Sequence, residues 1–120
     1  MAVTRGSTPS LQQELNDLVA RTFHRYTGRG ATRSRCVLGD DTVLVVLQDT
    51  LTKGEQVLVE HGRGADVLQL RTSYQEVMRE ELVAGVEGLT GRPVVAFLSA
   101  NQVDPDYAAE VFVLGEAPQD

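Results

Sequence analysis

The fold is decided by the stretch AFLSANQVDPDYAAEVFVL (Ala96–Leu114), in which two apolar runs flank a polar connection. Short runs of branched and aromatic residues bounded by turn-forming residues are typical of β-strands. We therefore expect strands at Val94–Leu98 and Glu110–Leu114. The connection between them, residues 100–109, is long for a hairpin, and long loops often carry contacts. It is either a functional site or only a turn.

A second pair of strands is expected in TRSRCVLGDDTVLVVLQ (Thr32–Gln48). In its first half, Arg33, Arg35 and Val37 alternate with the intervening residues, and GDDT supplies the turn of a hairpin. VLVVL (Val43–Leu47) is a continuous apolar run, which is expected of a central strand covered on both faces.

The spacing of apolar residues predicts a helix at about residues 10–27, because they recur on one helical face. Ser10 and Gln13 form a capping-box pattern at its start. Gly28 follows its last turn and is a natural C-terminal stop.

A second capping-box pattern, Thr52 with Glu55, predicts another helix that runs through Val59. The glycines of EHGRGAD (Glu60–Asp66) predict a break or a weak turn. A helical period resumes after it and ends at Gly91.

This order of elements, α-β-β-α-β-β, predicts an α+β fold with a mostly antiparallel four-stranded sheet and helices packed on one face. We expect a disordered N-terminus over residues 1–9, a single domain over residues 10–115 and a disordered tail over residues 116–120. Helices on one face leave the other face to a partner or a second copy. We therefore expect a homodimer, most simply with two-fold symmetry.

The composition argues against several classes of function. The chain has 120 residues and a net charge of −6, with three Phe, three Tyr and no Trp. This acidity and the scarcity of aromatic side chains argue against nucleic-acid binding. The single cysteine, Cys36, excludes an internal disulfide and fits a reducing compartment. No apolar run approaches the roughly 20 residues that span a bilayer, so we expect a cytoplasmic protein without direct membrane insertion.

The first third of the chain has a local excess of arginine. TGRGATR (Thr27–Arg33) places glycines and arginines near a helix end. They could cradle an anion, or they could form a helix cap and a connector. Phosphate loops place their glycines before a helix N-terminus, whereas these follow a C-terminus, where the dipole repels anions. Arg29, Arg33 and Arg35 are therefore candidate binding residues with both interpretations open.

The polar connection holds the other candidate binding residues, Asn101, Asp104 and Asp106. Their oxygens suit a hard cation, but the loop lacks the Gly and the distal Glu of an EF-hand. Asn and Asp also stabilise turns by bonding to the backbone. The sequence shows neither zinc-ligand spacing nor a coherent catalytic set. We expect no catalytic residue, no metal and no cofactor.

Four stretches together resemble one family: YTGRGATR (Tyr26–Arg33), LQDTLTKGE (Leu47–Glu55), MREELVAGVEGLTGR (Met78–Arg92) and VVAFLSANQVDPDYAAEVFVL (Val94–Leu114). They are similar to the MpsC family, whose name refers to a bacterial sodium-translocating, membrane-potential-generating system. The resemblance covers nearly the whole chain. Family members usually carry an acid and a histidine where this chain has Ala100 and Gln102. This departure favours a structural loop or a contact surface there.

The resemblance implies a soluble accessory domain of a membrane ion-translocating or inorganic-carbon transport system, with a membrane transport protein as a partner. We expect its role to be noncatalytic. The alternative is a regulatory domain that binds a small ligand or an anion through the Arg29–Arg35 region. Arginines converging in a pocket would favour the alternative, and a flat apolar patch would favour a protein partner.

Overall fold

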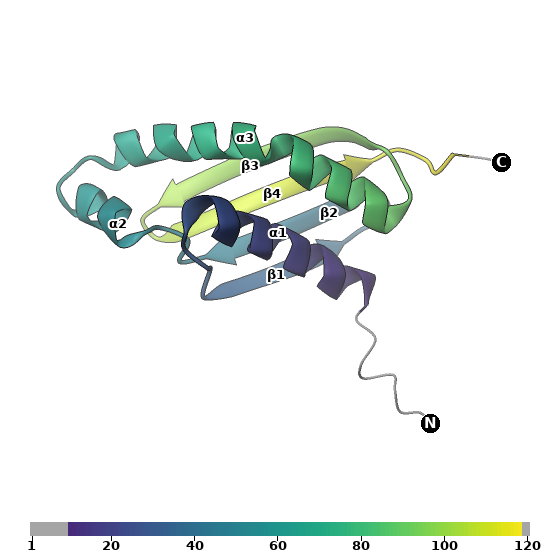
Figure 1. Ribbon diagram of the computed structural model, residues 1–120, viewed down its shortest axis with the longest axis horizontal. Helices are drawn as coiled ribbons and strands as arrows, with labels where there is room; N and C mark the ends of the chain where they lie inside the picture. The colour runs from purple at the N-terminus through teal and green to yellow at the C-terminus, as the bar shows by residue number, and fades with distance from the viewer. Residues whose placement is uncertain (1–9, 119–120) are drawn as a thin grey trace, which may run out of the picture.

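The structure is a computed structural model that describes residues 10–118 (Figure 1). The disorder expected over residues 1–9 and at the last two residues lies outside this part. Along the chain the elements are α1 (Leu11–Thr27), β1 (Arg33–Leu38), β2 (Thr42–Gln48), α2 (Lys53–Glu60), α3 (Gly64–Thr90), β3 (Val94–Val103) and β4 (Asp106–Leu114).

The strands form one four-stranded sheet in the order β1-β2-β4-β3, and every neighbouring pair is antiparallel. Helices α1 and α3 cross one face of this sheet, and α2 lies near one end of it (Figure 1). The expected α+β fold with helices on one face is confirmed. The expected break after α2 divides the second helical region, so the order is α-β-β-α-α-β-β.

Local signals in the sequence set the helix ends. The Ser10 hydroxyl accepts a hydrogen bond from the Gln13 amide at 3.1 Å. Thr52 and Glu55 form the complete reciprocal capping box expected for α2. Gly28 and Gly91 end α1 and α3 with φ of 77° and 70°, which glycine adopts without the steric cost of a Cβ.

The core lies between the sheet and the two long helices. Side chains at alternate positions of β2 point toward the helices and are fully buried, as is Phe112 of β4. The helices contribute buried residues at helical spacing: Leu15, Val19 and Phe23 from α1, and Met78, Leu82 and Val86 from α3. Burial of large apolar side chains of this kind contributes about 1.5–3 kcal/mol each.

Strand β2 is central, as VLVVL predicts, but helices cover only one of its faces. Val43, Val45 and Leu47 are buried, whereas the intervening Leu44 and Val46 are only half-buried. A continuous apolar run in a sheet with a single helical layer therefore leaves apolar side chains on the opposite face.

The prediction of a long connection at residues 100–109 is wrong. Strand β3 continues to Val103 and β4 begins at Asp106, so Asp104 and Pro105 alone form the turn. The peptide between them is cis. Asn101 lies within β3 and points toward α3, where the Gln75 amide pairs with it. Asn101 is therefore an inward-facing strand residue with its partner on a helix, although the local sequence predicts a loop residue.

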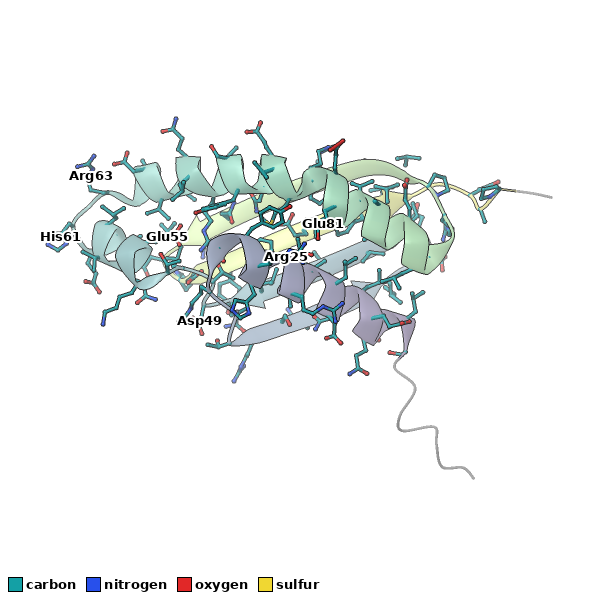
Figure 2. The ribbon with its side chains drawn as sticks, viewed as in Figure 1. Arg25, Asp49, Glu55, His61, Arg63 and Glu81 are labelled. Atoms are coloured by element: carbon teal, nitrogen blue, oxygen red, sulfur yellow. The ribbon has the colours of Figure 1, made fainter. Side chains whose placement is uncertain are left out.

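Polar contacts also join the helices. Arg25 of α1 forms an ion pair with Glu81 of α3 (Figure 2), and the Tyr26 hydroxyl donates to Glu81 at 3.0 Å. The Arg25 and Glu81 side chains are 58% and 40% exposed. A pair so open to solvent adds little stability because water screens it.

A buried ion pair connects α2 to α3. Arg71 is 1% exposed and holds Glu55 through two hydrogen bonds, Nη2 to Oε1 at 2.8 Å and Nε to Oε2 at 3.2 Å. Arg71 also donates to the carbonyl of Thr50 in the β2–α2 connection. Because Glu55 is also the capping residue of α2, one carboxylate starts this helix and anchors it to the next.

Replacing Arg71 with Met should lower the free energy of unfolding by about 3–5 kcal/mol, because Glu55 would be left as a buried charge without its cationic partner. Adding Glu55→Gln should recover most of this loss, since Gln keeps an oxygen for the cap and carries no charge. Urea unfolding of both variants measures the effect. Equal losses in the single and double variants would contradict the role given to this pair.

Candidate functional site

The candidate residues from the sequence are distributed over three separate hollows. Arg33 and Arg35 line one of them, beside β2 and Tyr107. Arg29 lines another together with Asp104 and Asp106. Asn101 lines the third, between α3 and β3. The three arginines therefore do not converge on one pocket.

The hollow with Arg29 lies where three connections meet. The Nε of Arg29 donates to the carbonyl of Asp49 at 3.1 Å, and Thr32 donates to the Asp49 carboxylate. Asp106 accepts from the Thr50 hydroxyl at 3.1 Å and from the Leu51 amide at 2.8 Å. Both Asp106 oxygens thus bind the β2–α2 connection, so this side chain has a structural role.

The His, Cys, Asp and Glu side chains of residues 10–118 do not gather into a metal-binding group. Within them, no group of three or more His, Cys, Asp or Glu side chains could hold a metal ion. Asp104 and Asp106 flank the tight turn, and the second of them is already engaged by the protein.

The sheet face opposite the helices, here named the open face, carries a continuous row of apolar side chains. The register places Val37 of β1 beside Leu44 of β2, Leu44 beside Val111 of β4, and Val111 beside Leu98 of β3. Val37 is 48% and Leu98 60% exposed. One apolar row therefore crosses all four strands.

The neighbouring rows of the open face extend this surface. One runs through Arg35, Val46, Ala109 and Ala100, and another through Thr42, Val113 and Ala96. The row toward the β3–β4 turn is polar and consists of Arg33, Gln48, Tyr107 and Gln102. These rows contain no acidic side chain, although the chain has a net charge of −6. Their only charges are the two arginines of β1.

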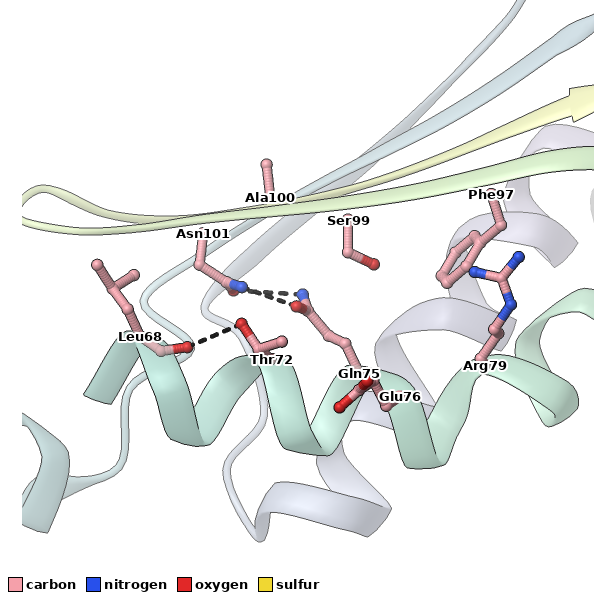
Figure 3. Close-up of a pocket in the computed structure, with 9 residues that line it drawn as sticks. All are labelled: Leu68, Thr72, Gln75, Glu76, Arg79, Phe97, Ser99, Ala100 and Asn101. Atoms are coloured by element: carbon pink, nitrogen blue, oxygen red, sulfur yellow. Dashed lines mark hydrogen bonds between the residues drawn. The ribbon is translucent and has the colours of Figure 1, made fainter. Parts of the chain in front are cut away.

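A buried polar cluster lies on the opposite side of the sheet, beneath α3. Glu110 of β4 is fully buried. It accepts hydrogen bonds from Ser99 Oγ and from Gln75 Nε2, the latter at 2.9 Å. Gln75 and Asn101 exchange two further hydrogen bonds through their amides, as Figure 3 shows. The cluster borders a hollow of about 300 Å³.

Glu110 is a site residue that the sequence analysis missed. Its signal is its position, since it lies between the apolar Ala108 and Phe112 on the inward side of a strand. Burial raises the pKa of Glu110 to about 7, and the hydrogen bonds from Ser99 and Gln75 oppose part of that rise. The carboxyl group can therefore bind and release a proton near neutral pH.

The comparison with protein families gives a match over residues 7–116 to the family described as Na+-translocating membrane potential-generating system (MpsC). The chain belongs to the MpsC family. No curated protein and no solved structure matches it. No helix within residues 10–118 combines the length and apolarity needed to cross a membrane.

Three of the segments that carry the MpsC resemblance meet at one end of the sheet. Arg29 and Thr32 of the first segment bind Asp49 of the second. Asp106, from the last segment (Val94–Leu114), binds Thr50 and Leu51 of the second. The polar residues of these segments thus stabilise one another at one end of the sheet.

The buried Glu110 should make stability depend on pH. Because its pKa is raised from 4.5 to about 7, the native state holds this proton more tightly than the unfolded state does. Its contribution is complete below pH 4.5 and is lost as the pH rises through 7. The total change is about 3 kcal/mol, from 1.36 kcal/mol per pKa unit.

The measurement is urea unfolding of the wild type and of Glu110→Gln between pH 5 and pH 8.5. The variant should lose this pH dependence and be the more stable protein at high pH. Glu80→Gln, on the exposed side of α3, is the matched control and should follow the wild type. Parallel pH profiles for the wild type and Glu110→Gln would show that Glu110 does not titrate in this range.

Proposed function

We propose that this MpsC protein is a small, soluble, noncatalytic accessory domain of the cytoplasm that acts by protein contact on a sodium-translocating membrane system. The open face carries this proposal, and the printed family description supplies the membrane system. We further propose that the chain works as a homodimer.

The size of the open face supports protein contact. Four strands spaced about 4.8 Å apart and three successive rows give roughly 300 Å² in projection. Apolar patches of about this size or larger on a single chain are often functional. Exposed Val37 and Leu98 at its two sides show that the patch reaches both edges of the sheet.

The charges of the open face indicate the chemistry of the partner. Arg33 and Arg35 border the apolar rows on the β1 side, and no acid lies within the rows. The best-matched partner is a protein surface with an apolar centre and acidic groups at its rim, because complementary charges orient an apolar contact.

The polar groups near the hollows support a noncatalytic role. The side chains of Asp106, Glu110 and Asn101 are each held by hydrogen bonds to neighbouring protein groups. The Ser99 and Thr50 hydroxyls donate to Glu110 and Asp106, and these contacts join neighbouring strands and connections. The alternative of an anion-binding domain draws less support, because Arg29 lines a different hollow from Arg33 and Arg35.

Val111→Lys should weaken binding to the membrane partner at least about tenfold, because it places a charge in the centre of an apolar contact. Inside-out vesicles from host cells that lack the chain provide the assay. Added wild-type protein should restore the sodium-dependent membrane potential, as read with a potential-sensitive dye, and Val111→Lys should not.

Val77→Lys is the matched control, because Val77 is 64% exposed on α3 and away from the open face. It should restore the potential as well as the wild type does. Circular dichroism checks that both variants fold. A potential that is independent of the added protein, or a Val111→Lys variant as effective as the wild type, would refute the proposed function.

A further inference from the structure

The two edge strands of the sheet differ in how well they are protected against pairing with another strand. Among residues 10–118, the strand order leaves one side of β1 and one side of β3 without a neighbouring strand. Strand β1 has six residues, of which Arg33 and Arg35 are charged. Strand β3 has ten residues, VVAFLSANQV, without a charge or a proline.

An unpaired edge presents backbone donors and acceptors that a further strand can bind. Proteins usually block such an edge with charges, with proline or by keeping the strand short. Strand β1 is short and charged, whereas β3 is long and uncharged. The register irregularity between Val94 and Ala96 affects only the start of β3, so Ala96–Val103 forms a regular edge.

We infer that β3 pairs with β3 of a second copy, antiparallel and across a two-fold axis, so that the two sheets become one. This inference rests on the homodimer of the proposed function and assigns its interface. The pairing satisfies the free backbone groups of the residues that face each other across the axis. It leaves the open face of each copy free, and the two faces join into one apolar surface for the membrane partner.

The pleat of the strand restricts the register of this pair. Residues directly opposite each other in an antiparallel pair lie on the same side of the sheet. Leu98 is on the open face and Phe97 and Ser99 are on the helical side, so the axis must pass through a residue position and not between two. With the axis at Leu98, the apolar row of one copy continues into that of the other.

Two charged residues of α3, Arg79 and Glu76, lie where the same axis would bring opposite charges together. Helix α3 runs antiparallel to β3, since one hollow joins Leu68 with Asn101 and the next joins Glu87 with Val94. Arg79 lies over the ring of Phe97 at 5.1 Å. Glu76, one helical turn before Arg79, lines the same hollow as Arg79, Phe97 and Ser99 (Figure 3).

These two residues are therefore level with Leu98, on the side of α3 that faces the edge. A two-fold axis at Leu98 brings Arg79 of each copy toward Glu76 of the other. Two equivalent ion pairs then join the helices above the paired strands. Both remaining edges of the joined sheet are β1 strands protected by arginines, so the assembly closes as a dimer.

Cysteine cross-linking tests this register. Opposite Cα atoms in an antiparallel pair are about 4.5–5.5 Å apart, which lies within the disulfide range of about 4.4–6.8 Å. Cys36 is the only native cysteine and is buried, so Cys36→Ser gives the background. In that background, Leu98→Cys should form a covalent dimer rapidly under mild oxidation. Val111→Cys, in the centre of the open face, should not.

The outcomes separate this inference from the proposed function. A dimer by light scattering that cross-links through Val111→Cys and not through Leu98→Cys would keep the proposed homodimer and overturn the β3 interface. A monomer at high micromolar concentration would overturn both the homodimer and the interface. Neither result affects the vesicle assay, which tests the membrane partner independently.

A charge exchange tests the helix contact. Arg79→Glu should raise the dissociation constant of the dimer at least about tenfold, because it places like charges opposite each other. Glu76→Arg combined with Arg79→Glu should restore the dissociation constant to within about threefold of the wild type. Sedimentation equilibrium measures all three proteins. A double variant as weak as Arg79→Glu alone would refute the ion pairs across the axis.

Discussion

The placement of both long helices, α1 and α3, on one side of the sheet is the constraint on which the rest of this structure depends. Alternate residues of β2 and β4 enter a core beneath α1 and α3, and this burial determines where the remaining side chains lie. Leu44 and Val111 must then point away from the helices. An apolar surface on the far side follows from the same alternation that builds the core.

Much of this fold follows from local sequence signals, because those signals act within a few residues. Thr52, Glu55, Gly28 and Gly91 set helix ends through their own backbone bonds or conformations. The β3–β4 hairpin was misjudged for the opposite reason. Asn101 is polar in a strand because Gln75, far away in the sequence, supplies its partner. No local pattern contains that information.

The candidate site residues could be named from the sequence, but which of them lie together could not. Arg29, Arg33 and Arg35 are close in sequence, but one lies in a connection and two on an alternating strand, so they line different hollows. The sequence predicts that Asp106 stabilises its own turn, whereas both of its oxygens bind the β2–α2 connection. Its partners in the β2–α2 connection could not be identified without the pairing of β2 with β4. Spatial convergence of separate segments requires the tertiary fold.

The buried polar cluster has a consequence for the edge strand. Among the residues of β3 only Phe97 is buried on the helical side, so apolar burial specifies its register through a single side chain. A shift of β3 along β4 would separate Ser99 from Glu110 and Asn101 from Gln75. It would leave a buried carboxyl group with fewer partners, at a cost of about 1–3 kcal/mol or more. The burial of Glu110 therefore costs stability as the pH rises toward neutral, and the hydrogen bonds of the cluster fix the position of β3. Only a strand in one register can present a defined edge to a second copy.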